Sequence, residues 1–398
     1  MHPSDEIRGT KSNILNKKKI VIGITGSIAS IECVRLCREL IRHGAQVFPV
    51  MTPSATKIIH PDSLEFATGN KPIIELTGKT EHVLFCGRVK EPVDLFIISA
   101  CTANTISKIA HGIDDTTVTT FASTAIGSGI PILIVPAMHI SMYDHKIVQD
   151  NIENCKKIGI KFVEPYINEN KAKMADIDEI VARSIRVIGK NDMINKNILI
   201  IGGSTVESVD DVRTISNRSS GKTSVYLVKN AFMRGACVEF WYGCSKEPSP
   251  IYIDTVRFES VEDILELLEN INLSKFDIII MCAAISDYIP IKRKGKISSG
   301  EKKLVLEMLP APKVIAKLRE KAKNSKIIGF KLEENKEELA KKAYEFLEKN
   351  KLDFVVANTI SGIEGENNKV WTVDKKGNFS IKEGSKKKLA DHILDMAK

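Results

Sequence analysis

Two unlike strand–glycine–helix openings occur in this chain, one near its start and one in mid-chain. The first reads KIVIGITGSIA over residues 19–29, and the second begins ILIIGGST at residue 198. In each, an apolar run typical of a buried strand ends in a turn of glycine and small polar residues. Such turns lie at the carboxyl ends of strands in a parallel α/β sheet, where phosphate groups bind. The pattern predicts two α/β domains with two sites, and therefore a bifunctional protein.

Strands and helices are expected to alternate along both halves of the 398 residues, which suffice for two hydrophobic cores. That alternation favours a doubly wound, Rossmann-like parallel sheet in each half. In the first half we expect strands at 19–24, 46–51, 94–99 and 131–135, and helices at 28–43, 53–60, 103–111 and 174–188. In the second half we expect strands at 198–201, 236–241, 277–282, 326–329 and 354–357, helices at 220–234, 261–270, 312–323 and 334–350, and a closing hairpin at 369–381.

The expected boundary between the domains is the polar segment 189–196, where a glycine follows a helix. Residues 1–18 are expected to be a polar lead-in, because they lack the apolar core of a signal peptide. The first domain would then span residues 19–189 and the second residues 190–398.

Composition excludes several classes of protein. Hydrophobic residues at 43% and charged residues at 27% are typical of a soluble globular chain. The longest apolar stretches, such as residues 130–138, are too short for a bilayer span, so no membrane association is expected. The net charge of +8 comes from lysines interleaved with glutamates, as in residues 333–338, so solvated helix faces explain it better than nucleic-acid binding. The eight cysteines form no CxxC pair, which fits a reduced cytoplasmic protein.

Three elements of the first half could bind a phosphorylated cofactor. The turn at Gly26, Ser27 and Ile28 enters a helix but lacks the G-x-G-x-x-G fingerprint, so it could equally be a tight connection. A second turn follows the strand at 94–99 and carries polar side chains at a helix start, where they could simply cap the helix: Ser99, Thr102 and Asn104. The third element, PAMHISMY at residues 136–143, also follows a strand directly.

Together, in this order and spacing, the three elements resemble the flavin-containing cysteine decarboxylases, and more closely the decarboxylase half of the bifunctional coenzyme A biosynthesis flavoproteins. The resemblance implies a flavodoxin-like flavoprotein domain with bound FMN. It implies that the FMN site is formed by Gly26, Ser27, Ile28, Ser99, Thr102 and Asn104. It also implies that His82 is the active-site histidine and that Met138 and His139 bind substrate.

A flavin is needed because an aliphatic carboxylate beside an amide nitrogen has no electron sink for decarboxylation. Oxidation of the neighbouring thiol to a thioaldehyde creates that sink, and the hydride is returned afterwards. His82 would be a base or orienting group, since the ordinary pKa of histidine is close to neutral pH; an isolated histidine before an apolar run is otherwise more often structural.

This half departs from the family pattern at three places. His139 stands where the family has asparagine, and Tyr143 stands where it has tryptophan. His139 could supply the asparagine's hydrogen bond to the substrate carboxylate, or could donate a proton. In the substrate flap, residues 164–174, only Lys173 and Met174 match, and the family's cysteine is missing. Another donor must then act in the final reduction, or this half is altered in activity.

The second half carries a longer motif. Residues 216–223 suggest a Walker A loop, but Ser216 occupies the position of its first glycine, which argues against a P-loop. The whole run GGSTVESVDDVRTISNRSSGK at 202–222 resembles the signature of the phosphopantothenate–cysteine ligases. Further matches follow in family order at Cys282–Tyr288, Lys296, Pro312–Ile315 and Gly329–Phe330.

The ligase resemblance implies that CTP converts a carboxylate into an acyl-cytidylate, which the amine of cysteine attacks. Asn217 would hold the acyl group, Lys296 would neutralise charge on the triphosphate, and Asp287 would bind magnesium. The nucleotide and the substrate would also bind to a further set of residues: Pro312, Lys313, Val314, Ile315 and Phe330. Taken singly, Asn217 could equally be a cap, Lys296 a loop lysine and Asp287 a cap at the end of a strand.

Two positions depart from the ligase pattern. The family's A-N-D is here Ala357, Asn358 and Thr359, and a late lysine is replaced by Asn350 between Lys349 and Lys351. Triphosphate contacts could shift to those two lysines, and the preference for CTP is less firmly indicated.

The combined hypothesis is a coenzyme A biosynthesis enzyme that joins 4′-phosphopantothenate to cysteine and then decarboxylates the product to 4′-phosphopantetheine. The resemblance also implies a homo-oligomer with trimeric flavin halves and dimeric ligase halves, which together would build a dodecamer. Two alternatives stay open: a ligase with a degenerate flavin half, and a non-catalytic flavin-binding regulatory protein.

Overall fold

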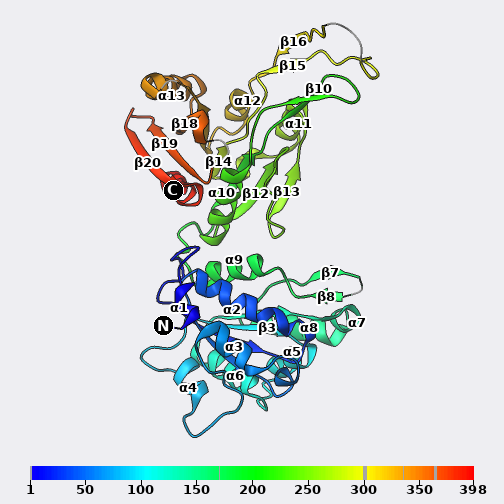
Figure 1. Ribbon diagram of the computed structural model, residues 1–398, viewed down its shortest axis with the longest axis vertical. Coiled ribbons are helices and arrows are strands. Elements are labelled where there is room, and N and C mark those ends of the chain that lie inside the picture. The colour runs from blue at the N-terminus through cyan, green and yellow to red at the C-terminus, as the bar shows by residue number, and fades with distance from the viewer. Residues whose placement is uncertain (1, 170, 299–302, 335, 363–364) are drawn as a thin grey trace. The chain divides into compact units, whose positions relative to one another are not determined.

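The computed structural model describes residues 2–169, 171–298, 303–334, 336–362 and 365–398. The chain divides into two compact units, Met1–Asn191 and Asp192–Lys398, and each is described by itself (Figure 1). No helix among the described residues is both long and apolar enough to cross a membrane.

The N-terminal unit is built on a five-stranded parallel sheet whose strand order is β2-β1-β3-β4-β6. This is the flavodoxin-like order of doubly wound folds. The central strands are buried on both faces, which explains why they read as continuous apolar runs rather than as alternating patterns. The strands are β1 (Lys19–Ile24), β2 (Gln46–Met51), β3 (Leu95–Cys101), β4 (Ile132–Pro136) and β6 (Lys161–Phe162).

Helices cover both faces of this sheet. On one face Val21, Phe96 and Ile98 pack against one group of helices: α4 (Glu81–Cys86), α5 (Ala103–Ala110), α6 (Thr117–Ser128) and α8 (Lys146–Lys157). A second group packs together around α2: α2 itself (Cys33–Arg42), α3 (Pro61–Thr68) and α9 (Ile177–Ile188). Alternate residues of β1 thus serve two separate layers of core, as a two-faced sheet requires.

Several elements of this unit differ from expectation. The helix expected at 53–60 is only a 3₁₀ turn over Ala55–Lys57, and the true helix α3 starts at Pro61, where proline is favoured as the first helical residue. A small antiparallel sheet with strand order β5-β8-β7 was not expected; it consists of β5 (Met138–His139), β7 (Tyr166–Asn168) and β8 (Lys171–Lys173). The helix expected from 174 begins at Ile177, because Asp176 caps it.

The C-terminal unit holds an eight-stranded sheet whose order is β13-β12-β9-β14-β17-β18-β19-β20. Its first six strands are parallel, and the last two form the antiparallel hairpin that the sequence predicts. The strands are β9 (Asn197–Gly202), β12 (Cys237–Tyr242), β13 (Asp254–Arg257), β14 (Ile278–Met281), β17 (Lys326–Leu332), β18 (Phe354–Asn358), β19 (Asn367–Asp374) and β20 (Phe379–Ser385).

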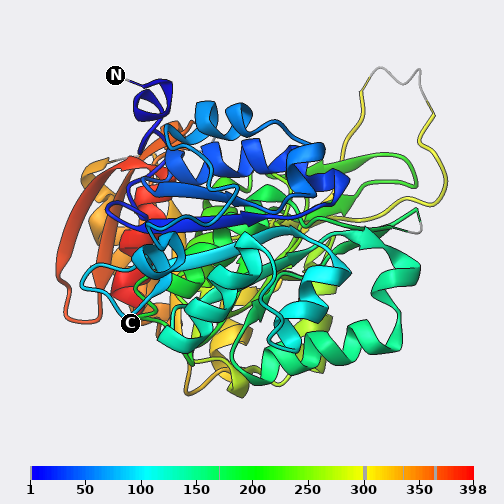
Figure 2. The same ribbon diagram turned by 90° about the horizontal axis from the view of Figure 1, so that it is seen from below.

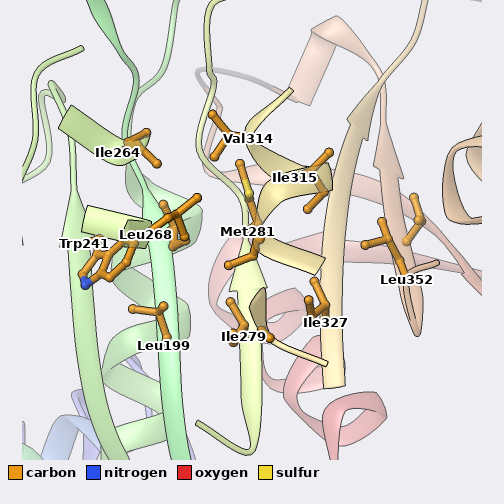
Figure 3. Packing of buried hydrophobic residues seen from close by; sticks show 14 of the residues in the cluster. Leu199, Trp241, Ile264, Leu268, Ile279, Met281, Val314, Ile315, Ile327 and Leu352 are labelled. Carbon is orange, nitrogen blue, oxygen red and sulfur yellow. The ribbon is translucent and has the colours of Figure 1, made fainter. Parts of the chain in front are cut away.

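Two hydrophobic layers enclose this sheet. On one face Leu199, Trp241 and Ile279 pack against α11 (Val261–Asn270), α12 (Val314–Lys321) and α13 (Lys336–Asn350), as Figure 3 shows in part. On the other face Ile198 and Ile200 pack against α10 (Lys222–Met233) and α14 (Lys386–Ala397). Both units are therefore α/β folds with parallel sheets, and the expected fold class is confirmed.

A two-part arm extends from the eight-stranded sheet. One hairpin pairs β10 (Val206–Ser208) with β11 (Thr214–Ser216), and the other pairs β15 (Tyr288–Pro290) with β16 (Met308–Pro310). The yellow second hairpin projects beyond the sheet in both views (Figures 1 and 2). The first hairpin contains residues 206–216 of the signature run, and Lys296 lies between the two strands of the second.

Candidate functional site

A buried threonine joins the two turns expected to bind flavin. The Thr25 hydroxyl donates to the Ala100 carbonyl at 2.6 Å and accepts the backbone N–H of Thr102 at 3.1 Å. The carboxyl ends of β1 and β3 therefore lie side by side, as phosphate sites in such sheets require. Thr25 was missed at the sequence level, although a hydroxyl residue directly between a strand and a glycine is a usable signal.

The first turn leaves no space for a larger residue at Gly26. A Cβ there would lie 2.6 Å from the Cβ of Ser54. Ser27 precedes the 3₁₀ turn Ile28–Glu32 with an extended backbone, and its hydroxyl makes no capping bond. Ile28 is 75% exposed. A serine hydroxyl that makes no capping bond, beside a close-approach glycine, is an arrangement that fits the phosphate of a flavin nucleotide.

The second turn combines capping with an exposed amide. Thr102 accepts the backbone N–H of Thr105 at 3.3 Å, so it does cap α5, while Asn104 in the first turn of that helix is exposed. Ser99 is fully buried within β3, and its hydroxyl donates to the Met174 sulfur at 3.3 Å. The structure thus brings Ser27, Thr102 and Asn104 to the carboxyl ends of β1 and β3, whereas the Ser99 side chain is buried within β3.

His139 lies next to these turns. The backbone N–H of Ala137 donates to the Cys101 carbonyl at 3.0 Å, which ties the end of β4 to the end of β3. Nδ1 of His139 accepts the backbone N–H of Ser141 at 3.2 Å, so in the neutral ring Nε2 carries the proton. His139 is exposed and pairs with Lys171 of the flap, while Met138 pairs with Ala172. The ring can therefore present an N–H donor, as an asparagine amide does.

Tyr143 fastens the start of the flap. Its hydroxyl donates to Oε2 of Glu164 at 2.8 Å. Burial, followed by this carboxylate, raises the pKa of Tyr143, so it stays protonated at neutral pH. Cys155, the nearest cysteine in sequence, is buried in α8, and burial raises its pKa to about 11. Neither its position nor its protonation state suits it to replace the missing flap cysteine.

His82 occupies a separate position, on α4. This helix packs against α6, and no hydrogen bond or ion pair among the described residues joins His82 to the turns at Gly26 or Thr102. Its Nδ1 atom is buried and makes no hydrogen bond with any described residue. An unsatisfied buried ring nitrogen is costly, which makes it a candidate for contact with a ligand or another copy of the chain.

In the C-terminal unit the signature segment meets the loop after β14. The side-chain amide of Asn217 donates to the Ile285 carbonyl at 3.0 Å and approaches the Ala284 carbonyl at 3.4 Å. The Thr205 hydroxyl donates to the Ser286 hydroxyl at 3.1 Å and accepts the Ser286 backbone N–H at 3.0 Å. Residues 67 to 81 positions apart in the sequence therefore meet at the carboxyl edge of β9 and β14.

The two aspartates of the signature hold the loop that carries Lys296. Asp210 accepts the backbone N–H of Ile297 at 3.0 Å, and Asp211 accepts that of Gly295 at 2.9 Å. The Ile297 N–H, with further donors from Arg213, keeps the pKa of Asp210 well below its usual range. The residues on both sides of Lys296 are thus anchored, while its own side chain is exposed.

Asp287, the residue expected to bind a metal, forms an ion pair with Lys313. Oδ1 of Asp287 lies 2.5 Å from Nζ of Lys313, and both side chains are mostly exposed. The described residues contain no group of three or more histidine, cysteine, aspartate or glutamate side chains that could hold a metal ion. One carboxylate is nevertheless compatible with magnesium carried by nucleotide phosphates.

The turn expected to bind the nucleotide is divided between surface and core. Pro312 and Lys313 are exposed, but Val314 and Ile315 are buried against α11 and the sheet (Figure 3). The side chains of Val314 and Ile315 belong to the hydrophobic core, so only the backbone atoms of these residues could contact a ligand. Phe330 lines the cavity described next, at the end of the sheet.

A cavity of about 180 Å³ opens at the carboxyl ends of β9, β14, β17 and β18. It is lined by the glycine turn, by the segment after Asn217 and by the loop after β14, including Gly203, Arg218, Ser219, Ser220, Ala283 and Ala284. Gly203 has φ +80°, and a Cβ there would lie 2.9 Å from the Gly243 backbone. Lys349 and Lys351 line a different, basic cleft with Arg319, Lys323 and Lys375, so their expected contact with the triphosphate stays a prediction.

Comparisons with known proteins cover both units. The family model described as Flavoprotein matches residues 8–189, and the model described as DNA/pantothenate metabolism flavoprotein C-terminal domain matches residues 193–398. The coenzyme A biosynthesis bifunctional protein CoaBC of Thermococcus kodakarensis is 44% identical over 99% of this chain and 98% of its own length. The protein of the same name from Methanocaldococcus jannaschii is 40% identical over 100% of this chain and 98% of its own length. Among solved structures, a C-terminal domain of CoaBC matches with 27% identity and a TM-score of 0.42, over 52% of this chain and 95% of that chain.

Proposed function

The chain belongs to the family of bifunctional coenzyme A biosynthesis proteins, and from that premise we propose how its two units act. The protein is an enzyme of coenzyme A biosynthesis with a flavoprotein decarboxylase unit and a ligase unit. In our proposal, residues 190–398 join 4′-phosphopantothenate to cysteine with CTP, and residues 19–189 decarboxylate the product with FMN.

The ligase proposal rests on the Asn217 contact with the loop after β14. A carboxylate is a poor acyl donor until its oxygen becomes part of a phosphate ester, and charge develops on the acyl oxygen when the amine attacks. The Asn217 amide, held at the Ile285 carbonyl, would orient the activated acyl group by exchanging its longer hydrogen bond, to the Ala284 carbonyl, for one to the acyl oxygen. The anchored loop places Lys296 where it could neutralise phosphate charge.

CTP and magnesium are part of this proposal. Phe330 in the cavity wall offers a ring for a base, and Asp287 offers one carboxylate for a phosphate-bound ion. For Mg²⁺ to bind there, Lys313 has to move away from Asp287 or share the phosphate charge. Because both side chains are exposed, such a rearrangement costs little.

For the decarboxylase unit we propose FMN as the flavin, with its phosphate at Ser27 and the Thr102 turn. Bound flavin supplies a reversible two-electron oxidation of the substrate thiol. His139, with its proton on Nε2, would donate a hydrogen bond to the substrate carboxylate. His82 would act as the active-site base or orienting group.

We also propose a homo-oligomer of trimeric flavin halves and dimeric ligase halves in the cytoplasm. Exposed apolar side chains near the flavin turn and on α4 support contact between copies, since Ile28 is 75% and Leu84 is 58% exposed. A neighbouring copy of the chain would then be able to form a hydrogen bond with the buried Nδ1 of His82.

One experiment tests both activities. Purified protein should be yellow, should release pyrophosphate from CTP when both substrates are present, and should release CO2 from phosphopantothenoylcysteine. His82→Asn should abolish CO2 release while leaving pyrophosphate release unchanged. If decarboxylation survives that change, the assignment of His82 is wrong; if the wild type releases no CO2, the ligase-only alternative is correct.

A further inference from the structure

The small antiparallel sheet of the flavin unit has one polar face. In such a sheet, directly paired residues point to the same face, and neighbours along a strand point to opposite faces. Lys171 on β8 pairs with His139 on β5 and with Asn168 on β7. Lys173, two residues further along β8, pairs with Tyr166 in the same way. These five side chains therefore share one face, and all of them are polar.

The opposite face of this sheet carries apolar side chains. Ala172, between the two lysines, is 1% exposed, and its partners across the sheet are Met138 and Ile167. Met138 packs against the hydrophobic core of the unit. A shift of the strands by one residue would exchange the two faces, so the burial of Ala172 fixes the register that puts Lys171 beside His139.

Strand β8 is held at the edge of the main sheet where the flavin is proposed to bind. The backbone N–H of Ala137 donates to the end of β3, two residues before His139. The Ser99 hydroxyl of β3 donates to the sulfur of Met174, three residues after Lys171. Three residues of extended chain span at most about 10 Å, so Lys171 is fixed near the carboxyl ends of β3 and β4.

Lys171 and His139 present two hydrogen-bond donors side by side. Nδ1 of His139 accepts the Ser141 N–H at 3.2 Å, so the neutral ring carries its proton on Nε2. The Lys171 ammonium forms no hydrogen bond or ion pair with another described residue, and Glu169, the carboxylate that its charge affects, accepts Nζ of Lys173 at 3.0 Å. Directly paired residues have Cβ atoms about 5 Å apart. Both donors can thus reach one carboxylate, whose two oxygens accept them together.

We propose that Lys171 is a substrate-binding residue of the decarboxylase unit, whose ammonium binds the carboxylate of phosphopantothenoylcysteine together with His139. The inference rests on the proposed decarboxylase function. It adds a charged contact that the family's flap pattern does not contain, since only Lys173 and Met174 match that pattern. The negative charge leaves the carboxylate as CO2 forms, so this ion pair strengthens binding of the substrate without assisting the loss of CO2.

The test uses two ligands that differ in the carboxylate. Phosphopantothenoylcysteine carries it, whereas the product 4′-phosphopantetheine keeps the phosphate and the thiol but lacks the carboxylate. KM and kcat for the substrate are measured from CO2 release by the full-length flavin-loaded protein, and the inhibition constant of the product is measured in the same assay. The variants are Lys171→Met, Lys171→Arg, which keeps the charge, and Lys161→Met, a control at an exposed strand lysine of the same unit.

We expect Lys171→Met to raise the KM for phosphopantothenoylcysteine roughly tenfold, the lower end for one charged hydrogen bond, because the lysine is exposed. The kcat should stay within about twofold of the wild-type value, and the inhibition constant of 4′-phosphopantetheine should not change. Lys171→Arg should keep most of the affinity for the substrate. Lys161→Met should match the wild type, and pyrophosphate release should be unchanged in every variant.

Three results would overturn the inference. An unchanged KM in Lys171→Met would mean that the ammonium does not contact the substrate. An equal weakening of substrate and product would place the lysine at the phosphate, which both ligands carry. A lowered thermal midpoint that Lys171→Arg does not restore would show a structural role. Failure of the decarboxylase function is distinguishable: the wild type would release no CO2, and the dissociation constants of both ligands, then measurable at equilibrium, would still decide the role of Lys171.

Discussion

Asn217 is the side chain whose replacement separates the two activities most cleanly. Asn217→Asp keeps the size but replaces the N–H donor with a carboxylate facing the carbonyls of Ala284 and Ile285. We expect pyrophosphate release to fall roughly 10²- to 10³-fold, as when an oxyanion-stabilising donor is removed. CO2 release from supplied phosphopantothenoylcysteine should not change.

The matched control for that change is Asn272→Asp. Asn272 caps a short 3₁₀ turn through its side-chain oxygen, a role that aspartate fills equally well. Ligase activity should therefore be normal in this variant. Wild-type activity in Asn217→Asp would show that the amide has no role beyond its contact with the loop.

Gly203 is a glycine of the proposed ligase cavity whose backbone conformation excludes other residues. Gly203→Ala combines a left-handed φ of +80° with a Cβ 2.9 Å from the Gly243 backbone. The conformational part alone costs about 1–2 kcal/mol, and the close approach adds to it, so the thermal midpoint should fall and ligase activity should be lost. Gly377→Ala is the control, since Gly377 has φ +74° but only an ordinary contact at 3.6 Å, and it should show the smaller, conformational loss alone.

At the scale of elements, Asp210 couples the β10–β11 hairpin to the Lys296 loop. Asp210→Asn keeps one acceptor but loses the charge that Arg213 and the Ile297 N–H stabilise. We expect pyrophosphate release to fall at least tenfold, with a higher KM for CTP, because the Lys296 loop loosens. Lys292→Met removes only the exposed ion pair with Asp211, so this variant should release pyrophosphate at close to the wild-type rate.

The same carboxylate predicts a pH dependence of stability. Because the pKa of Asp210 is lowered in the folded protein, its contribution is complete above the pKa of a free aspartate, about 4, and is lost as pH falls toward the lower folded-state value. The urea midpoint of Asp210→Asn should therefore lie below that of the wild type at neutral pH, and the difference should begin to shrink as the pH falls below about 4. Parallel curves down to pH 2 would contradict this account.

Strands were predicted well because a doubly buried strand leaves a continuous apolar run, as β9 does. Helix α6 was not predicted, since its sequence TVTTFASTAIGS has many β-branched residues and no charges. The strands β5, β7 and β8 contain only two or three residues each and exist through pairing with one another, which no local pattern reveals. Similarly, the order of motifs predicts which segments form a ligase site, but the hydrogen bonds from Asp210 and Asp211 to the Lys296 loop depend on tertiary structure.

At the scale of the whole molecule, the two sites lie in units that are each compact. Both ends of the C-terminal unit are tied together, because Arg234, directly after α10, binds Asp192 at the start of the unit and Asp395 near its end. The termini of the ligase unit are thus held by ion pairs within that unit. This arrangement suits two consecutive reactions that share an intermediate but no catalytic group.

A chain beginning at Asp192 should consequently fold and release pyrophosphate from CTP at close to the wild-type rate, since its hydrophobic layers and site loops are all internal to that unit. A chain that also carries Asp192→Asn loses part of the Arg234 clamp, so its thermal midpoint should fall by a few degrees, as expected for the loss of about 1 kcal/mol. Pyrophosphate release by both fragments and by the full-length protein provides the measurement. Loss of ligase activity in a folded fragment would mean that the flavin unit contributes to the ligase reaction, and the two activities would then have to be treated as coupled.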